Sequence, residues 1–452
     1  LLVSAALLLL PVSVLLFARR AVPGRAANVL LGMPFVLGWA FAMGFLGFQL
    51  GLGLGVLTLA FGWEPAVGER GVAARGRHAL ASLAYLLCVW VHPVVALITG
   101  LAFLLLEGRA VLRWREWPRM LVVVGPAAVF LVGSYLTANA GGAAALAPAK
   151  THFSDPVSVL GAAFEYDIGY SPFELLPRIA ALALLLPAFA RALRAHPPSR
   201  GGAEAAVGRL VLALLVLYCV MPGTLADWYY CSARFLAFAW LLLPVAAELS
   251  PRIRRRVLVI GPALTAVVLA VQWPVLHRAS AEMQDVLDVG ASLPRGARFV
   301  PMAFTLSVLG PQPTGAAWGE LVLERDAVAS QLFAAGRPRM GGERFRTLTF
   351  RPGMLDPERG ALPWSGAEMS DAWRPCAAEG SPARWFVHFD GSCDDALAGR
   401  RQELGRVLDR YDYVLMLDPP PFGRDLLGPR LRLVRQSGSA WLYAVVHEGA
   451  AG

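Results

Sequence analysis

Apolar residues are concentrated in the first 276 residues of the chain, where they form a series of long blocks. A helix needs about 20 apolar residues to cross a hydrocarbon core about 30 Å thick. After His277 the apolar runs become short and alternate with polar residues. The pattern predicts a polytopic transmembrane domain over 1–276 and a soluble domain over 277–452. The blocks are Leu1–Phe17, Val29–Trp63, His78–Leu106, Met120–Ala138, Leu175–Ala190, Leu210–Met221, Phe235–Leu249 and Val257–Leu276.

Two of these blocks are too long for a single crossing. Val29–Trp63 is rich in glycine, and we expect a break near Gly44–Gly51; His78–Leu106 is expected to break at His92-Pro93. We interpret each block as a helical hairpin, one half of which can be re-entrant where protein or a wet cavity covers its backbone. The predicted fold class is a multi-pass α-helical membrane protein with about ten membrane segments and a C-terminal extracytoplasmic domain.

Arginine-rich loops alternate with loops that contain acids and at most one basic residue, and this alternation predicts the orientation. Cytoplasmic loops carry an excess of Lys and Arg. The loops 138–174 and 223–232 contain acids and a single lysine, which predicts that they lie outside. The final block then exits, so the domain 277–452 is predicted to be extracytoplasmic and the protein to lie in the cytoplasmic (inner) membrane. The predicted cytoplasmic loops are 18–25, 70–77, 109–119, 191–209 and 252–256.

The composition supports this organisation. The chain is 56% hydrophobic and 16% charged, whereas soluble domains are about 25% charged. A water-soluble enzyme of ordinary design and a disordered chain are therefore both excluded. The net charge of +9 is accounted for by arginines of the cytoplasmic loops, so we infer no nucleic-acid partner.

The residues after His277 predict an α/β or α+β domain. A helix is expected over Ala396–Arg410, because its leucines fall on one side. Cys376 and Cys393 are a candidate disulfide, since an extracytoplasmic domain permits one. No cysteine and histidine spacing indicates zinc. Strands are expected at 297–300, 347–350, 385–389, 413–417, 431–434 and 440–446.

Polar residues in the two predicted outer loops are the candidates for chemistry. Arginine can hold a phosphate through two parallel hydrogen bonds, and aromatic rings can stack on sugars or lie at the level of lipid headgroups. Walker, GxSxG and HExxH signatures are absent from the sequence. The candidates for binding a substrate or a lipid phosphate are Lys150, His152, Asp155, Asp227, Tyr229 and Arg234.

Each candidate also has a structural interpretation. The aromatics beside Tyr229 can form an interfacial belt with Arg234 extending to the surface, or Arg234 can pair with Asp227. His92 lies in a membrane block, where a buried polar group is costly. We expect its ring to be satisfied by a carbonyl freed at the helix break rather than to act in catalysis.

Several stretches resemble bacterial polytopic proteins of the glycosyltransferase C superfamily. They are GFLGFQLGLGLGVLTLAF (44–61), HPVVALITGLAFLLL (92–106), MPGTLADWYYCSARFLAFAWLLL (221–243), YDYVLMLDPPPFG (411–423) and SGSAWLYAV (437–445). The chain departs from the resemblance at Gly47, where related proteins usually carry Asn.

The resemblance implies transfer of a sugar, on the outer face of the membrane, from a polyprenyl-phosphate-linked donor to an acceptor. Membrane lipid and that donor are the implied partners, and a divalent metal stays open as a cofactor. The family's catalytic acid lies in the first outer loop, after the first membrane helix. Because the chain begins at Leu1 rather than Met, we expect it to be N-terminally truncated and the catalytic carboxylate to lie upstream of Leu1.

Two other functions stay open. A transporter or flippase-like protein tends to show internal repeats and ionisable groups at mid-membrane, and neither stands out in the sequence. A non-catalytic scaffold that presents the C-terminal domain would lack the upstream carboxylate.

Overall fold

The computed structural model describes thirteen segments of the chain and six single residues. By contacts the chain divides into two units, Leu1–Trp273 and Pro274–Gly452. The described segments are 2–38, 46–64, 72–139, 172–197, 202–222, 224–225, 228–229, 231–303, 328–329, 334–338, 346–350, 411–417 and 428–447, with Phe153, Val159, Ala163, Leu321, Arg325 and Leu408.

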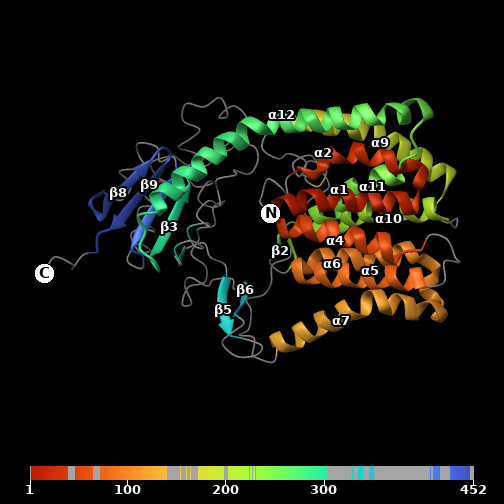
Figure 1. The fold of residues 1–452 in the computed structure, drawn as a ribbon, viewed down its shortest axis with the longest axis horizontal. Coiled ribbons are helices and arrows are strands. Elements are labelled where there is room, and N and C mark those ends of the chain that lie inside the picture. The colour runs from red at the N-terminus through yellow and green to blue at the C-terminus, as the bar shows by residue number, and fades with distance from the viewer. Residues whose placement is uncertain are drawn as a thin grey trace. The chain divides into compact units, whose positions relative to one another are not determined.

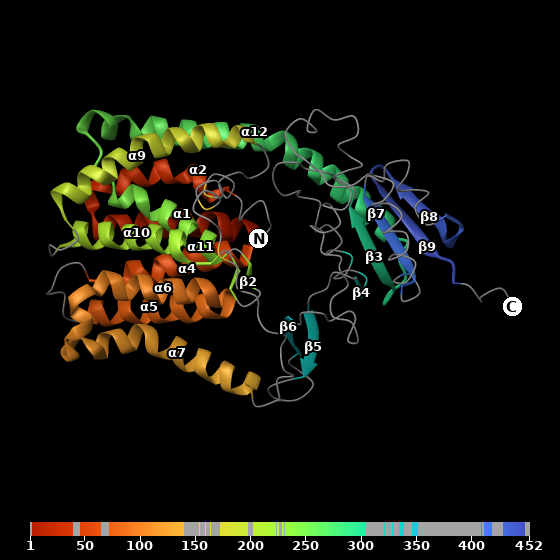
Figure 2. The ribbon, with the colours of Figure 1, turned by 180° about the vertical axis from the view of Figure 1, so that it is seen from behind.

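The first unit is a bundle of helices that run side by side, with α7 on one flank and α9 and α12 on the other (Figures 1 and 2). A two-stranded hairpin, β1 (Thr224–Leu225) and β2 (Trp228–Tyr229), precedes α11. The helical elements are α1 (Leu2–Ala21), η1 (Pro23–Gly32), α2 (Met33–Val36), α4 (Leu46–Gly62), α5 (Val72–Val91), α6 (Pro93–Glu107), η2 (Gly108–Leu112), η3 (Trp114–Glu116), α7 (Trp117–Asn139), η4 (Pro172–Glu174), α9 (Leu175–Ala195), α10 (Ala203–Val220), α11 (Cys231–Ala246) and α12 (Pro251–Gly290).

Three helices of the described part are long and apolar enough to cross a membrane: α9, α10 and α12. Four shorter apolar helices or helix parts accompany them, at 47–62, 93–107, 117–130 and 232–246. The described part of the chain is therefore largely helical with three candidate membrane-spanning helices, and the count of about ten segments stays a prediction.

The two long apolar blocks differ in how they are broken. The break at His92 is confirmed, because α5 ends at Val91 and α6 begins at Pro93. The first block is not a simple helical hairpin, because its first part is the 3₁₀ helix η1 followed by the four-residue α2. The expected break over Gly44–Gly51 also extends too far towards the C-terminus, because Gly51 lies inside α4.

Glycines in α4 let neighbouring helices approach closely instead of breaking the helix. A Cβ on Gly51 would lie 3.0 Å from the Cβ of His92, and one on Gly55 would overlap the hydroxyl of Thr99 in α6. A Cβ on Gly53 would lie 2.9 Å from Leu9 of α1. Small residues at helix contacts in membranes allow this approach, which here sets the spacing of α1, α4 and α6.

We predict that Gly55→Ala lowers the thermal stability of the detergent-solubilised protein. The methyl group would overpack a full interface, at a cost of about 1–3 kcal/mol. The matched control is Gly125→Ala in α7, where a Cβ meets nothing within 4 Å. Alanine is the better helix former, so the control should keep or raise the unfolding midpoint; equal midpoints for the two variants would contradict the assigned packing.

The second unit contains a five-stranded sheet in the order β4-β3-β7-β9-β8. The strands β3, β4 and β7 are parallel, whereas β9 is antiparallel to both β7 and β8. A separate antiparallel pair is formed by β5 and β6. The bounds are β3 (Arg298–Ala303), β4 (Val328–Ala329), β5 (Ala334–Pro338), β6 (Arg346–Phe350), β7 (Tyr413–Leu417), β8 (Leu431–Ser437) and β9 (Ala440–Val445).

The last turns of α12 cover this sheet. Val286 and Val289 form a buried cluster with Phe299, Leu415 and Leu442. The helix thus continues past Leu276, where the sequence pattern predicts the end of the membrane block. Five of the six predicted strands have a counterpart at nearly the predicted residues. The predicted strand 385–389, the helix Ala396–Arg410 apart from Leu408, and the pair Cys376 and Cys393 lie outside the described residues.

An ion pair links the beginnings of β3 and β7. The Arg298 guanidinium contacts the Asp412 carboxylate at 3.1 Å, and the Arg298 backbone N–H also donates to Asp412, at 3.1 Å. Partial burial acts to raise the pKa of Asp412, but the hydrogen bonds from Arg298 and its charge outweigh burial and hold that pKa below its ordinary value.

This lowered pKa predicts how the sheet responds to pH. An acid whose pKa is lower in the folded state stabilises the fold above its unfolded pKa, about 3.9, and loses that contribution as the pH falls towards the folded value. We expect hydrogen-exchange protection of β3 and β7, corrected for intrinsic rates, to be constant from pH 7 to 5 and to decrease below about pH 4.

The variant Asp412→Asn serves as the comparison for this experiment. It should show weaker protection at every pH and little further loss in acid. Because both side chains are partly exposed, the effect is expected to be small. Acid sensitivity of the same size in the variant would show that other carboxylates cause it.

Candidate functional site

His92 caps the N-terminus of α6 at the turn between α5 and α6. Its Nδ1 accepts a hydrogen bond of 3.3 Å from the Val95 backbone N–H, and its ring packs edge-on against Phe48 with a centroid distance of 5.5 Å. The expected carbonyl is not the partner: the Nδ1 atom accepts from an amide N–H instead. One ring nitrogen is therefore fixed in the helix cap.

Arg234 lies in the first turn of α11 and is half-buried. Its guanidinium interacts electrostatically with His92, so the two side chains belong to one end of the bundle, here termed the His92 end. The N-terminus of a helix carries partial positive charge from its unsatisfied N–H groups. Arg234 adds a full positive charge there, and together they favour an anion.

A buried polar network lies at the same end. Glu174, Arg178 and Gln272 are at most 1% exposed. Arg178 pairs with Glu174 at 2.9 Å and donates to the carbonyls of Pro34 and Leu37 at 3.0 and 2.9 Å. Gln272 of α12 donates to Glu174 and to the Leu37 carbonyl, at 2.8 Å each.

This network holds α2 and Leu37, the residue that follows it, and Gln49 completes the network. Gln49 of α4 donates to the Val36 carbonyl at 2.8 Å. It is the neighbour of Phe48, which packs against His92. The network and the pair of His92 and Arg234 are therefore connected through the first turn of α4.

The sequence analysis did not single out Arg178. Two signals were present: an arginine inside the apolar block Leu175–Ala190, and its position four residues after Glu174. Residues spaced by four lie on one face of a helix, which suits an ion pair. Its other partners, Pro34 and Leu37, are more than 140 positions away and cannot be read from a local pattern.

Of the predicted site residues, Arg234 is the one whose side chain can be placed. Tyr229 lies in β2 and pairs with Thr224, but only its backbone is described. Lys150, His152, Asp155 and Asp227 lie outside the described residues. Within the described ranges, no group of three or more His, Cys, Asp and Glu residues could hold a metal ion.

Exposed aromatic side chains mark two levels along the bundle. Trp90, Phe173 and Trp273 are 74%, 67% and 70% exposed, and each lies within two residues of His92, Glu174 or Gln272. Trp114 and Trp117, beyond the other end of α6, are 76% and 54% exposed. Aromatic residues gather at membrane–water interfaces, and the exposed aromatics at these two levels are of that kind.

Comparisons with known proteins show a weak likeness of fold. No family model matches the chain, and no curated protein matches it. The crystal structure of ArnT from Cupriavidus metallidurans bound to undecaprenyl phosphate is similar with a TM-score of 0.49 and 14% identity, covering 100% of this chain and 84% of that one. The apo state of ArnT is similar with a TM-score of 0.47 and 13% identity, covering 98% and 83%. A likeness at this level assigns no activity.

We predict that Arg178→Met strongly destabilises the helical unit. Removing one partner of a buried pair leaves the Glu174 charge uncompensated, which typically costs about 3–5 kcal/mol. Adding Glu174→Gln should recover part of the loss, and the coupling is measured by a double-mutant cycle on thermal unfolding. The exposed pair Arg278 and Glu282 is the control, where Arg278→Ala should cost less than about 1 kcal/mol. Additive effects of the two buried substitutions would contradict a coupled pair.

Proposed function

We propose that the chain is a membrane glycosyltransferase that transfers a sugar from a polyprenyl-phosphate-linked donor to an acceptor at the outer face of the inner membrane. The observation that carries the proposal is Arg234 in the first turn of α11, a half-buried cation that interacts electrostatically with His92. We propose that this turn lies at the depth of the lipid headgroups. The resemblance of 221–243 to the glycosyltransferase C superfamily supports it independently.

In this proposal Arg234 binds the phosphate of the lipid donor. When the bond between the sugar and the phosphate oxygen breaks, negative charge increases on the departing lipid phosphate. A guanidinium positioned against that charge stabilises the transition state more than the ground state. The acceptor hydroxyl loses its proton as it attacks, so a carboxylate must lie within hydrogen-bonding reach of it. Lys150, His152, Asp155, Asp227 and Tyr229 are proposed to complete the surface that binds the donor.

The buried network has a supporting role in this proposal. Glu174 is the last residue of η4 and the N-cap residue of α9, shortly after the segment 140–171, and Leu37 lies shortly before the segment 39–45. Gln272 donates to both the Leu37 carbonyl and the Glu174 carboxylate, and so holds these two residues together at the His92 end. We propose that these segments and the C-terminal unit are extracytoplasmic, as the alternation of arginine-rich loops predicts.

Binding of undecaprenyl phosphate to the purified, reconstituted protein tests the proposal. Arg234→Ala should weaken binding by about tenfold or more, the loss expected for a charge-assisted contact with phosphate. Membrane insertion should be intact, because Arg234 is half-buried at a helix end. Arg113→Ala, an exposed arginine of the predicted cytoplasmic loop, is the matched control and should bind like the wild type. Unchanged binding by Arg234→Ala would remove Arg234 from the site.

A further inference from the structure

Exposed arginines gather where α9 ends and α12 begins, at the end of the bundle opposite His92. The two helices lie on the same flank of the bundle (Figures 1 and 2). The backbone N–H of Glu248, shortly before α12, donates to the carbonyl of Ala188 in α9 at 3.1 Å, and Arg191 donates to the Glu248 carbonyl at 3.4 Å. The exposed arginines of these two helix ends, here termed the arginine patch, are Arg191, Arg194, Arg252, Arg254, Arg255 and Arg256.

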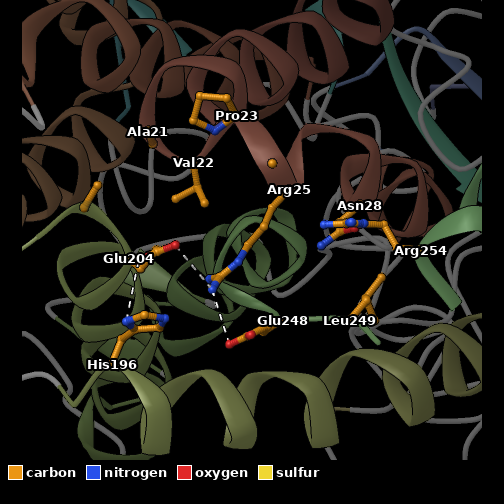
Figure 3. Close-up of a pocket in the computed structure, with 12 residues that line it drawn as sticks. Ala21, Val22, Pro23, Arg25, Asn28, His196, Glu204, Glu248, Leu249 and Arg254 are labelled. Atoms are coloured by element: carbon orange, nitrogen blue, oxygen red, sulfur yellow. Dashed lines mark ion pairs between the residues drawn. The ribbon is translucent and has the colours of Figure 1, made fainter. Parts of the chain in front are cut away.

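The acidic side chains beside the patch already have other partners. Arg25, whose side chain is 9% exposed, lies 3.8 Å from Glu204 and 3.6 Å from Glu248, and His196 lies 3.6 Å from Glu204 (Figure 3). Arg254 lines the same pocket but joins none of the ion pairs drawn in Figure 3. Within the described ranges, none of the six arginines of the patch forms an ion pair with a carboxylate. The patch therefore carries positive charge that these acids do not neutralise.

Four of these arginines lie at the start of α12, where local electrostatics disfavour them. The N-terminus of a helix carries partial positive charge, and the first turn of α12 contains no acidic residue. Arg252, Arg255 and Arg256 are spaced by three and four positions, so they share one face of the helix and repel one another. The positive-inside rule accounts for arginines in such loops, but it does not require two neighbouring helix ends to collect six exposed ones. An anionic surface placed against the patch would relieve this repulsion.

The same side of α12 continues as apolar surface. Leu258 and Val259 are 66% and 72% exposed, and they follow Arg255 by three and four positions, which places them on its side of the helix. Both α9 and α12 are long and apolar enough to cross a membrane. A cationic helix end followed by exposed apolar side chains matches an anionic phospholipid, whose phosphate meets the arginines while its acyl chains lie along the apolar residues.

We propose that the arginine patch binds anionic phospholipids of the predicted cytoplasmic leaflet, holding their phosphate groups with its guanidinium groups. A zwitterionic lipid offers the same phosphate but places a cation beside it, so the patch selects lipids by their net negative charge. The patch lies at the end of the bundle opposite Arg234, and the proposal does not depend on the proposed transfer reaction.

Native mass spectrometry of the full chain, released from nanodiscs that mix phosphatidylglycerol with phosphatidylcholine, tests this proposal. The protein should retain phosphatidylglycerol about tenfold better than phosphatidylcholine. The triple variant Arg252→Gln/Arg255→Gln/Arg256→Gln should lose most of this preference. Raising the salt concentration from about 0.1 to about 1 M shortens the Debye length from about 10 to about 3 Å, so it should weaken the preference as well.

Two further triple variants separate the patch from overall charge and from loss of the fold. Arg19→Gln/Arg75→Gln/Arg113→Gln removes the same charge from exposed arginines of three other predicted cytoplasmic loops, and it should keep the preference within about twofold. Arg252→Lys/Arg255→Lys/Arg256→Lys preserves the charge of the patch and should keep most of the preference.

Four outcomes would contradict the proposal. Equal loss of the preference in the two glutamine variants would show that the overall charge of the chain attracts the lipid, and would overturn the patch as a site. Equal retention of the two lipids by the wild type, or loss of the preference in the lysine variant, would overturn selection by charge. Displacement of the lipid by free glycerophosphate at a similar concentration would overturn the lipid as the source.

Discussion

The helical unit depends on how the chain satisfies its backbone between Pro23 and Leu37, where a 3₁₀ helix and the short α2 replace a continuous α-helix inside an apolar bundle. Carbonyl and amide groups cannot go without partners in such surroundings. Polar side chains from three other helices supply the partners: Gln49, Arg178 and Gln272 donate to the carbonyls of residues 34, 36 and 37. In return, Arg25 and Asn28 donate to carbonyls at the end of α11. The segment 23–37, for which the local apolar pattern predicts a helix, therefore contacts four helices: α4, α9, α11 and α12.

These hydrogen bonds between distant segments explain which features the sequence could predict and which it could not. Hydropathy and proline locate the break at His92, and alternation locates β7 at 413–417, because both signals are local. The 3₁₀ path of η1 was missed because apolar content says nothing about which hydrogen bonds the backbone makes. Arg178 was missed for a related reason, since its meaning lies in carbonyls that a distant part of the chain provides. Arg234 was singled out because an arginine at the start of an apolar helix is conspicuous in sequence, and its role in the site stays a prediction.

Charge is distributed to the two ends of the bundle, and each end uses it differently. At the end opposite His92, Glu64 forms ion pairs with Arg77 and Arg119, at 3.6 and 3.4 Å. These pairs connect the ends of α4, α5 and α7. Arg119 also pairs with the buried Glu107 at the end of α6. At the His92 end, the buried Arg178 and Glu174 bond to the carbonyls of Pro34 and Leu37 and to Gln272, while Arg234 is half-buried. The first arrangement fastens the ends of α4, α5, α6 and α7 together, and the second ties the end of α2 to α9 and α12.

The shortness of α6 has a consequence for the lipid around the molecule. Its 15 residues extend about 22 Å at about 1.5 Å per residue, less than the hydrocarbon thickness of about 30 Å. A span of this length creates a hydrophobic mismatch, which a bilayer relieves by thinning locally. Around such a helix the headgroup plane would be drawn inward at the turn that bears His92. Under the proposed function, a lipid phosphate would thereby reach the level of Arg234 without leaving its leaflet.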